Sequence, residues 1–144
     1  MTKLENFLKL NKDRQIWTIS KDQSVMQALI LMSDKNIGAI IIVDNNDFLV
    51  GIFSERDYAR KIILKGKNSK DTLLEEVMTK ELITVTRDFT IDQCMKLMIE
   101  HKIRHLPILE NKKVVGIISI GDVLKIMIEE QKELIDHLQK FITS

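Results

Sequence analysis

Residues 51–57 read Gly-Ile-Phe-Ser-Glu-Arg-Asp, and residues 116–122 read Gly-Ile-Ile-Ser-Ile-Gly-Asp. Both heptads have the pattern Gly-apolar-apolar-Ser-x-x-Asp, and each follows an apolar run. A serine three residues before an aspartate is an ordinary helix cap, because both side chains satisfy backbone N–H groups in the first turn. The same helix N-terminus could also bind a phosphate group. The function of the chain depends on which of these two interpretations holds.

The two heptads belong to an internal repeat. Displacing the sequence by 66 positions places Thr18 on Thr84 and Gln27 on Gln93, with many apolar matches between them. One extra residue at Asn45 changes the displacement to 65, and the heptads then align. Self-similarity at a constant spacing indicates a duplicated structural unit.

Each copy contains the same elements in the same order, which predicts an α/β (α+β) fold of two β-α-β-β-α repeats. Helices are expected after the capping boxes that begin at Ser24 and Thr90, each with Gln three residues later. Asx-rich turns between apolar runs predict hairpins. The expected strands are 16–19, 39–43 and 48–53 in the first copy, and 82–85, 106–109 and 113–118 in the second.

We divide the chain into an N-terminal helix (1–15), a first repeat (16–65), a linker (66–81), a second repeat (82–130) and a C-terminal helix extension (131–144). Thr2 and Glu5 predict a capping box for the first helix, with Leu10 on its packed face. Asp71 is a candidate start for a short helix in the linker. Two alternatives stay open for the C-terminal helix, whose apolar stripe packs either on a partner or on the protein's own core.

Composition narrows the class of protein. A hydrophobic content of 44%, a charged content of 30% and a net charge of +1 are typical of a globular protein without a strong field for nucleic acid or membrane. The basic stretch 60–70 lacks interleaved aromatic residues, so nucleic acid is not an expected partner. Cys94 is the only cysteine, so no intramolecular disulfide can form, which favours a cytoplasmic location. Its helical surroundings predict a buried, unreactive thiol. His101 and His105 have i, i+4 spacing, but Pro107 and the start of a strand oppose a continuous helix through them, and no carboxylate or cysteine completes a site, so no metal is predicted.

The tandem of β-α-β-β-α units with these heptads resembles the CBS domain family, named after cystathionine β-synthase, whose paired domains are called Bateman modules. Val77-Met78-Thr79 is similar to the family's linker, and His105-Leu106-Pro107 to the start of its second strand. The resemblance covers about residues 14 to 130. It implies a pseudo-two-fold pair of repeats, a homodimer, and a stand-alone regulatory or sensor protein that binds an adenosine-containing nucleotide (AMP, ADP, ATP or NAD) and modulates a partner. It implies no enzyme activity, no catalytic residue and no catalytic cofactor.

The heptads can be assigned chemical roles. Asp57 and Asp122 suit the hydroxyl groups of a ribose, as the acidic residue does in dinucleotide-binding folds. Gly51 and Gly116 lie inside expected strands, which indicates close approach by another backbone or by a ligand. Caps alone would not explain the repeated glycine. The alternative function is a ligand-free CBS-pair interaction or dimerisation module in which the heptads only cap helices.

The resemblance implies a nucleotide site between the repeats. Arg56 and Arg104 are expected to converge on phosphate, since guanidinium is a planar multidentate donor; the alternative is that both are surface charges. Trp17 either contacts adenine or belongs to the core. The backbone near Thr18 and Thr84 is expected to select adenine over guanine. The expected site residues are Ile16, Trp17, Thr18, Gly38, Ala39, Ser54, Arg56, Asp57, Ile83, Thr84, Arg104, His105, Ser119 and Asp122.

Overall fold

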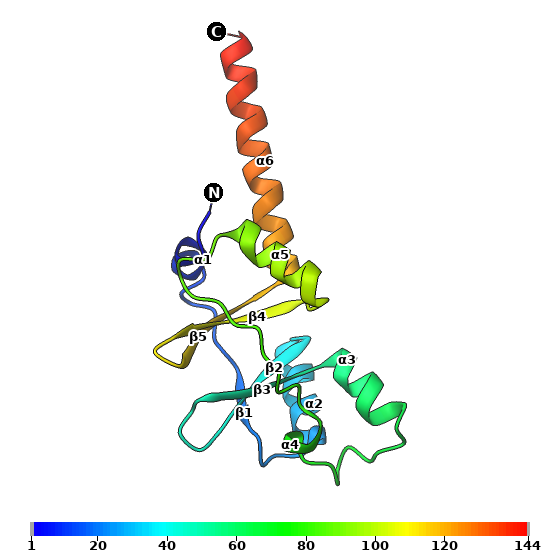
Figure 1. Ribbon diagram of the computed structural model, residues 1–144. Helices are drawn as coiled ribbons and strands as arrows, with labels where there is room; N and C mark the ends of the chain where they lie inside the picture. The colour runs from blue at the N-terminus through cyan, green and yellow to red at the C-terminus, as the bar shows by residue number, and fades with distance from the viewer. Residues whose placement is uncertain (1, 144) are drawn as a thin grey trace.

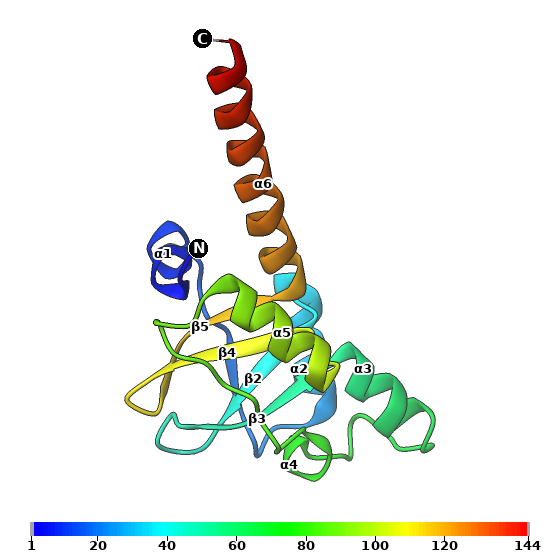
Figure 2. The same ribbon diagram turned by 45° about the horizontal axis from the view of Figure 1, so that its top comes forward.

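A computed structural model describes residues 2–143 (Figure 1) and confirms the two α/β repeats and the N-terminal helix. In both views the C-terminal helix leads away from the two sheets (Figure 1, Figure 2). The elements are α1 (Leu4–Leu10), β1 (Thr18–Ser20), α2 (Val25–Lys35), β2 (Ala39–Val43), β3 (Leu49–Ser54), α3 (Glu55–Asp57), the π-helix η1 (Tyr58–Ile63), α4 (Leu74–Val77), α5 (Ile91–His101), β4 (His105–Glu110), β5 (Lys113–Ser119) and α6 (Ile120–Thr143).

The first repeat forms a three-stranded sheet in the order β1-β2-β3. Strand β1 pairs in parallel with β2, and β2 pairs antiparallel with β3. Every residue of β2 is buried, as expected for the central strand of a sheet covered on both faces. Helix α2 buries Val25, Ala28 and Met32, and the capping box predicted at Ser24 is present.

The second repeat has only the two-stranded sheet β4-β5, so the strand predicted at 82–85 is wrong. Instead of a strand, this segment forms a single parallel β-bridge between Val85 and Ile108. Val85 N–H donates to the Pro107 carbonyl at 3.1 Å, and Leu109 N–H donates to the Val85 carbonyl at 2.9 Å. Continuing this ladder toward Ile83 would require an N–H from residue 107. Proline has none, so the pairing stops after one bridge.

Each repeat is completed by the chain segment that precedes the other repeat. Leu4 and Phe7 of α1 are buried in the core of the second repeat, and Leu4 N–H donates to the Phe89 carbonyl at 2.8 Å. Leu74 and Val77 of α4 are buried in the core of the first repeat. In Figure 1, α1 accordingly lies beside the second repeat and α4 beside the first. The segment that precedes each repeat therefore supplies core residues to the other repeat.

Three expectations for the helices that precede the repeats are wrong. The N-cap of α1 is Lys3, and the Thr2 hydroxyl donates instead to Glu130 of α6, while Thr2 N–H donates to the same carboxylate at 3.1 Å. Leu10 is 85% exposed, because it lies one turn past the buried stripe of α1. The linker helix begins at Leu74 rather than at Asp71, because the backbone before it pairs with the start of α2.

The heptad glycines accommodate side chains, which corrects the expectation of an approaching backbone or ligand. A Cβ atom on Gly51 would lie 2.5 Å from Met78 Sδ, and one on Gly116 would lie 2.6 Å from Leu8 Cδ2. Met78 and Leu8 belong to the two segments that complete the opposite repeats. Glycine is therefore needed here because the segment covering each sheet packs directly on the strand.

Helix α6 has two different halves. Its first turn buries Val123, and Ile126 and Met127 pack against the core of the second repeat. Every residue from 131 to 143 is exposed, and this half projects away from the body (Figure 1). The alternative in which the C-terminal stripe folds onto the protein's own core is therefore wrong for this half of the helix.

Candidate nucleotide site

Both heptads form reciprocal helix caps. Ser54 Oγ accepts the Asp57 N–H at 3.2 Å, while Asp57 Oδ2 accepts the Ser54 N–H at 2.9 Å and its hydroxyl at 3.0 Å. Ser119 and Asp122 repeat this arrangement, with distances of 2.9, 2.9 and 3.1 Å. The capping interpretation is thus confirmed for both copies, and each cap holds one carboxylate oxygen in place.

The second oxygen of Asp57 connects the first repeat to the linker. Asp57 Oδ1 accepts the Thr79 hydroxyl at 3.1 Å and pairs with Lys61 Nζ at 3.1 Å. Lys61 also donates to the Val77 carbonyl at 2.8 Å. A carboxylate offers about four lone-pair directions, and all four of Asp57 have protein partners. A ligand that used Asp57 would have to replace one of the linker contacts.

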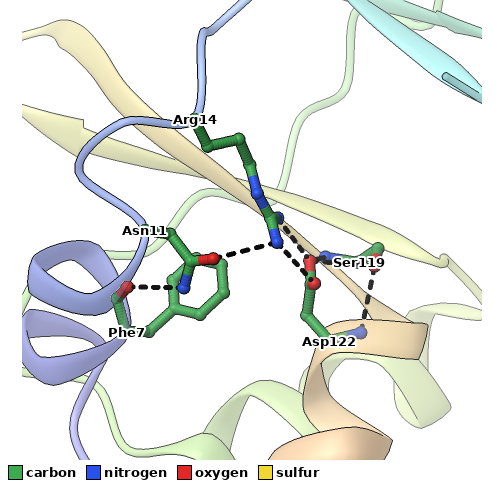
Figure 3. A network of polar contacts seen from close by, with 5 residues as sticks. All are labelled: Phe7, Asn11, Arg14, Ser119 and Asp122. Carbon is green, nitrogen blue, oxygen red and sulfur yellow. Dashed lines mark hydrogen bonds and ion pairs between the residues drawn. The ribbon is translucent and has the colours of Figure 1, made fainter. Parts of the chain in front are cut away.

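The second oxygen of Asp122 has a different partner. The guanidinium of Arg14 binds the carboxylate through two hydrogen bonds, at 3.1 and 3.2 Å (Figure 3). Asn11 accepts another Arg14 bond at 3.1 Å and donates to the Phe7 carbonyl at 2.8 Å. Burial alone would raise the pKa of Asp122, but the hydrogen bonds from Arg14 and Ser119 outweigh it and hold the pKa below its ordinary value. Asp122 is therefore held in its ionised form, and its charge is paired with that of Arg14 from the same chain.

A cleft of about 420 Å³ lies where the two repeats meet, and we call it the central cleft. Its volume is typical of small-molecule sites. The first repeat contributes its heptad, and the second contributes the start of β4 and the segment before α5. Its lining consists of Gly38, Ile52, Ser54, Glu55, Arg56, Asp57, Thr79, Glu81, Leu82, Ile83, Lys102, Ile103, Arg104, His105 and Pro107.

The structure brings together only part of the expected site. The predicted residues that line the central cleft are Gly38, Ser54, Arg56, Asp57, Ile83, Arg104 and His105. The predicted residues that lie elsewhere are Ile16, Trp17, Thr18, Ala39, Thr84, Ser119 and Asp122. Ala39 is buried in β2, and the Trp17 ring lies 4.2 Å from Lys35 Nζ. Sequence reasoning missed Thr79 as a site residue, although the Val77-Met78-Thr79 motif contains it.

The charges in the central cleft nearly balance. The acidic side chains Glu55, Asp57 and Glu81 accompany the basic side chains Arg56, Lys102 and Arg104. Arg56 is anchored by donating to the Lys102 carbonyl at 3.2 Å. Burial lowers the pKa of His105, and this effect outweighs the opposite influence of Asp122 and Glu55. His105 is therefore a neutral hydrogen-bonding group at neutral pH, and the cleft has no large positive field.

A second cleft, of about 500 Å³, lies between α1 and β5 and includes Ile16 and Arg14. Its other charged lining residues, Lys9, Lys12 and Arg87, are basic. Asp122 does not line this cleft, because Arg14 lies over its carboxylate (Figure 3). The carboxylate of the first heptad therefore lines a cleft, whereas that of the second heptad lines neither of the two clefts.

Metal-ligand clusters and membrane-spanning helices are absent from residues 2–143. This part of the chain contains no group of three or more His, Cys, Asp or Glu residues that could hold a metal ion. Burial raises the pKa of the Cys94 thiol to about 11, which leaves it unreactive. In the same described range, no helix combines the length and apolar character needed to cross a membrane.

Comparison with protein-family models matches residues 12–64 and 74–129 to the CBS domain. The chain therefore belongs to the CBS domain family and carries a pair of these domains. It is 44% identical to a CBS-domain protein of Burkholderia ambifaria MC40-6 described as a candidate signal-transduction protein. The two structures superpose with a TM-score of 0.84, over 90% of this chain and 96% of that one.

Among curated proteins, the CBS domain-containing protein CBSX3 of Arabidopsis thaliana, a mitochondrial protein, is 39% identical over 125 residues. That match covers 84% of this chain but only 61% of the relative. Inosine-5'-monophosphate dehydrogenase of Methanocaldococcus jannaschii is 31% identical over 113 residues, which are only 22% of that enzyme. The resemblance to an enzyme is thus limited to a small part of it.

Two solved structures show what relatives bind or assemble into. The CBS domain pair of protein MJ0100 was solved in complex with 5'-methylthioadenosine and S-adenosyl-L-methionine; it is 27% identical, with a TM-score of 0.79 over 90% of this chain and 98% of that one. A CBS-CP12 protein from bloom-forming cyanobacteria is hexameric; it is 27% identical, with a TM-score of 0.71 over 77% of this chain and 65% of that one.

Proposed function

We propose that this CBS pair is a sensor that binds one adenosine-containing nucleotide in the central cleft and modulates a partner protein without catalysing a reaction. The observation that carries the proposal is the meeting of Ser54 and Asp57 from one repeat with Ile83 and Arg104 from the other in a cleft of about 420 Å³. The adenosyl ligands of the MJ0100 pair support the ligand class. A homodimeric state and a cytoplasmic location stay predictions.

The ribose would bind at Asp57 by displacing one of the present partners of this carboxylate. Its hydroxyl groups would replace the Thr79 hydroxyl or the Lys61 ammonium on Asp57 Oδ1, while the cap keeps Oδ2 in place. Thr79 and Lys61 are also the groups that tie the linker to the first repeat. Ligand binding would then loosen the linker. This gives the unequal affinity for two conformations that a sensor requires.

The charge of the cleft favours a ligand with few phosphates. Arg56 and Arg104 can hold one phosphate group, but Glu55 and Glu81 line the same cleft. Each additional phosphate adds negative charge near these carboxylates, which costs binding energy. Among the candidate ligands AMP, ADP, ATP and NAD, we therefore expect AMP to bind more tightly than ATP.

Calorimetry with AMP on two matched variants tests the proposal. Asp57→Asn and Asp122→Asn both alter a heptad cap, but only Asp57 lines the central cleft. We expect Asp57→Asn to weaken AMP binding about tenfold or more, because a charge-assisted acceptor is lost. Asp122→Asn should stay within about twofold of the wild type, because Asp122 lies outside the central cleft and its cap and its contact with Arg14 do not touch the ligand. Equal weakening by the two variants, or wild-type affinity in both, would contradict a ribose role for Asp57.

One observation favours the alternative of a ligand-free interaction module. The carboxylates of Asp57 and Asp122 both have protein partners at each oxygen, so neither needs a ligand to be satisfied. A thermal-shift series with AMP, ADP, ATP, NAD and GMP separates the two functions. A shift with adenine nucleotides that exceeds the shift with GMP supports the sensor, and no shift with any of them supports the interaction module.

A further inference from the structure

The exposed half of α6 is a helix that needs a packing partner. Residues 131 to 143 are all exposed, and they extend beyond the folded body (Figure 1, Figure 2). A helical segment of this length is marginal on its own in water, because nucleation is costly and only packing of an apolar face compensates. The apolar face of this segment should therefore be covered in the working protein.

Five exposed apolar residues of α6, together with Gln131, follow a heptad pattern from position 124 to 142 with alternating steps of four and three, and the exposed Leu134 and Phe141 lie beside it on g positions. Between positions 124 and 142, isoleucine occupies every a position. The d positions in the same range hold leucine at both ends and glutamine in the middle. The a residues are Ile128, Ile135 and Ile142, and the d residues are Leu124, Gln131 and Leu138. The apolar members of this seam are between 47% and 79% exposed. Isoleucine at a with leucine at d is the pattern that favours parallel two-stranded coiled coils.

Gln131 indicates which partner fits this seam. In a parallel, in-register pair of identical helices, each d residue meets its own copy, so the two Gln131 amides can hydrogen-bond to each other. In an antiparallel pair, a d residue faces an a residue, and Gln131 would be buried against isoleucine. An unrelated apolar surface would likewise leave the amide without a partner, at a cost in free energy.

We infer that α6 pairs with α6 of a second copy of this chain, as a parallel coiled coil that runs from Leu124 to Ile142. The seam is roughly 27 Å long at 1.5 Å per residue. The neighbouring e positions Lys125 and Lys132 extend aliphatic stems along the seam while their charges reach water. This inference goes beyond the proposed nucleotide function and does not depend on any ligand.

Disulfide cross-linking of the full chain tests the pairing directly. In Gln131→Cys, two thiols at the same d layer would lie within disulfide range only in the parallel, in-register arrangement. His137→Cys is the matched control, because residue 137 lies on the same helix outside the seam. The native Cys94 is buried and does not compete. Under mild oxidation, we expect Gln131→Cys to form a covalent dimer at least tenfold faster than His137→Cys.

A second change verifies that the seam causes the cross-link. Adding Ile135→Glu to Gln131→Cys places two carboxylates at one a layer, so the cross-linking rate should fall at least tenfold, whereas adding Glu133→Gln outside the seam should leave it unchanged. Wild-type protein should have the mass of a dimer or a higher oligomer in light scattering at tens of micromolar without nucleotide. A monomer mass, or equal cross-linking at positions 131 and 137, would overturn the inference.

Discussion

Arg14 makes the two repeats chemically unequal. It holds the second heptad carboxylate through two hydrogen bonds, whereas Asp57 in the first heptad is held by Thr79 and Lys61. Lysine is a flexible point charge, while the planar guanidinium fits both carboxylate oxygens at once. If a ribose binds as proposed, we expect its hydroxyls to replace the partners of Asp57 more easily than those of Asp122, although both residues occur in the same sequence pattern.

Replacing Arg14→Gln should make the protein less stable at neutral pH and change its acid denaturation. The pKa of Asp122 in the folded protein lies below its ordinary value of 3.8, so this carboxylate adds stability above that value. The contribution is lost as the pH falls from about 3.8 through the lower folded pKa. Without Arg14 the folded pKa rises. We expect urea denaturation to show a loss of up to about 1 kcal/mol at pH 7 that disappears toward pH 3.

Lys9→Gln is the control for that measurement. It also removes a cation from the N-terminal segment, but its ion pair with Glu5 is long, at 3.8 Å, and exposed. This variant should match the wild type at every pH. An Arg14→Gln variant with wild-type stability from pH 7 to pH 3 would show that the contact with Asp122 contributes nothing to folding.

His105 should take up a proton when an anionic nucleotide binds. Burial lowers its pKa in the free protein, with Asp122 and Glu55 opposing this effect and Arg104 adding to it. A phosphate in the central cleft would raise the pKa, so more protons are bound in the complex than in the free protein. Affinity should therefore increase as the pH falls from 8 toward 6. Calorimetry in buffers of different ionisation enthalpy measures this uptake, which should be absent in His105→Asn.

At the scale of elements, the heptad glycines set how closely each preceding segment packs on its sheet. Gly51→Ala would bring a methyl group within 2.5 Å of Met78 Sδ, and Met78 is buried. We expect an overpacking loss of about 1–3 kcal/mol in the free energy of unfolding. Gly121→Ala is the matched control, because its added methyl group would lie 3.6 Å from Ser119 Oγ, an ordinary contact. Equal stability of the two variants in chemical denaturation would mean that Met78 moves aside freely.

The elements differ in how well local sequence determines them. Capping boxes at Ser24 and Thr90 correctly located α2 and α5, because a cap is formed by neighbours in sequence. The capping box predicted at Thr2 does not form, because the Thr2 hydroxyl hydrogen-bonds to Glu130, a residue distant in sequence. The strand at 82–85 failed because Pro107, on another element, cannot donate to it. Contacts between distant residues overrode the local pattern in both failures.

At the scale of the whole molecule, the duplication and its alternating elements were readable from the sequence, and so was the pairing of the repeats through the family resemblance. Only about half of the expected site residues line the central cleft. Ser54, Arg56 and Asp57 were predicted together because they share one motif, and Arg104 because it precedes the matching strand of the second repeat; all four line the central cleft. The Arg14–Asp122 contact could not be found, because nothing local links residues 108 positions apart.

The crossed packing of the segments before the repeats affects how the protein unfolds. Leu74 and Val77 supply core to the first repeat, while Leu4 and Phe7 supply core to the second. If either repeat unfolds, the segment that precedes it detaches, and the core of the other repeat loses the side chains of that segment. We therefore expect one cooperative transition instead of two independent ones. Strain applied to the linker that leads into the second repeat would be felt in the core of the first repeat, because Leu74 and Val77 of that linker are buried there.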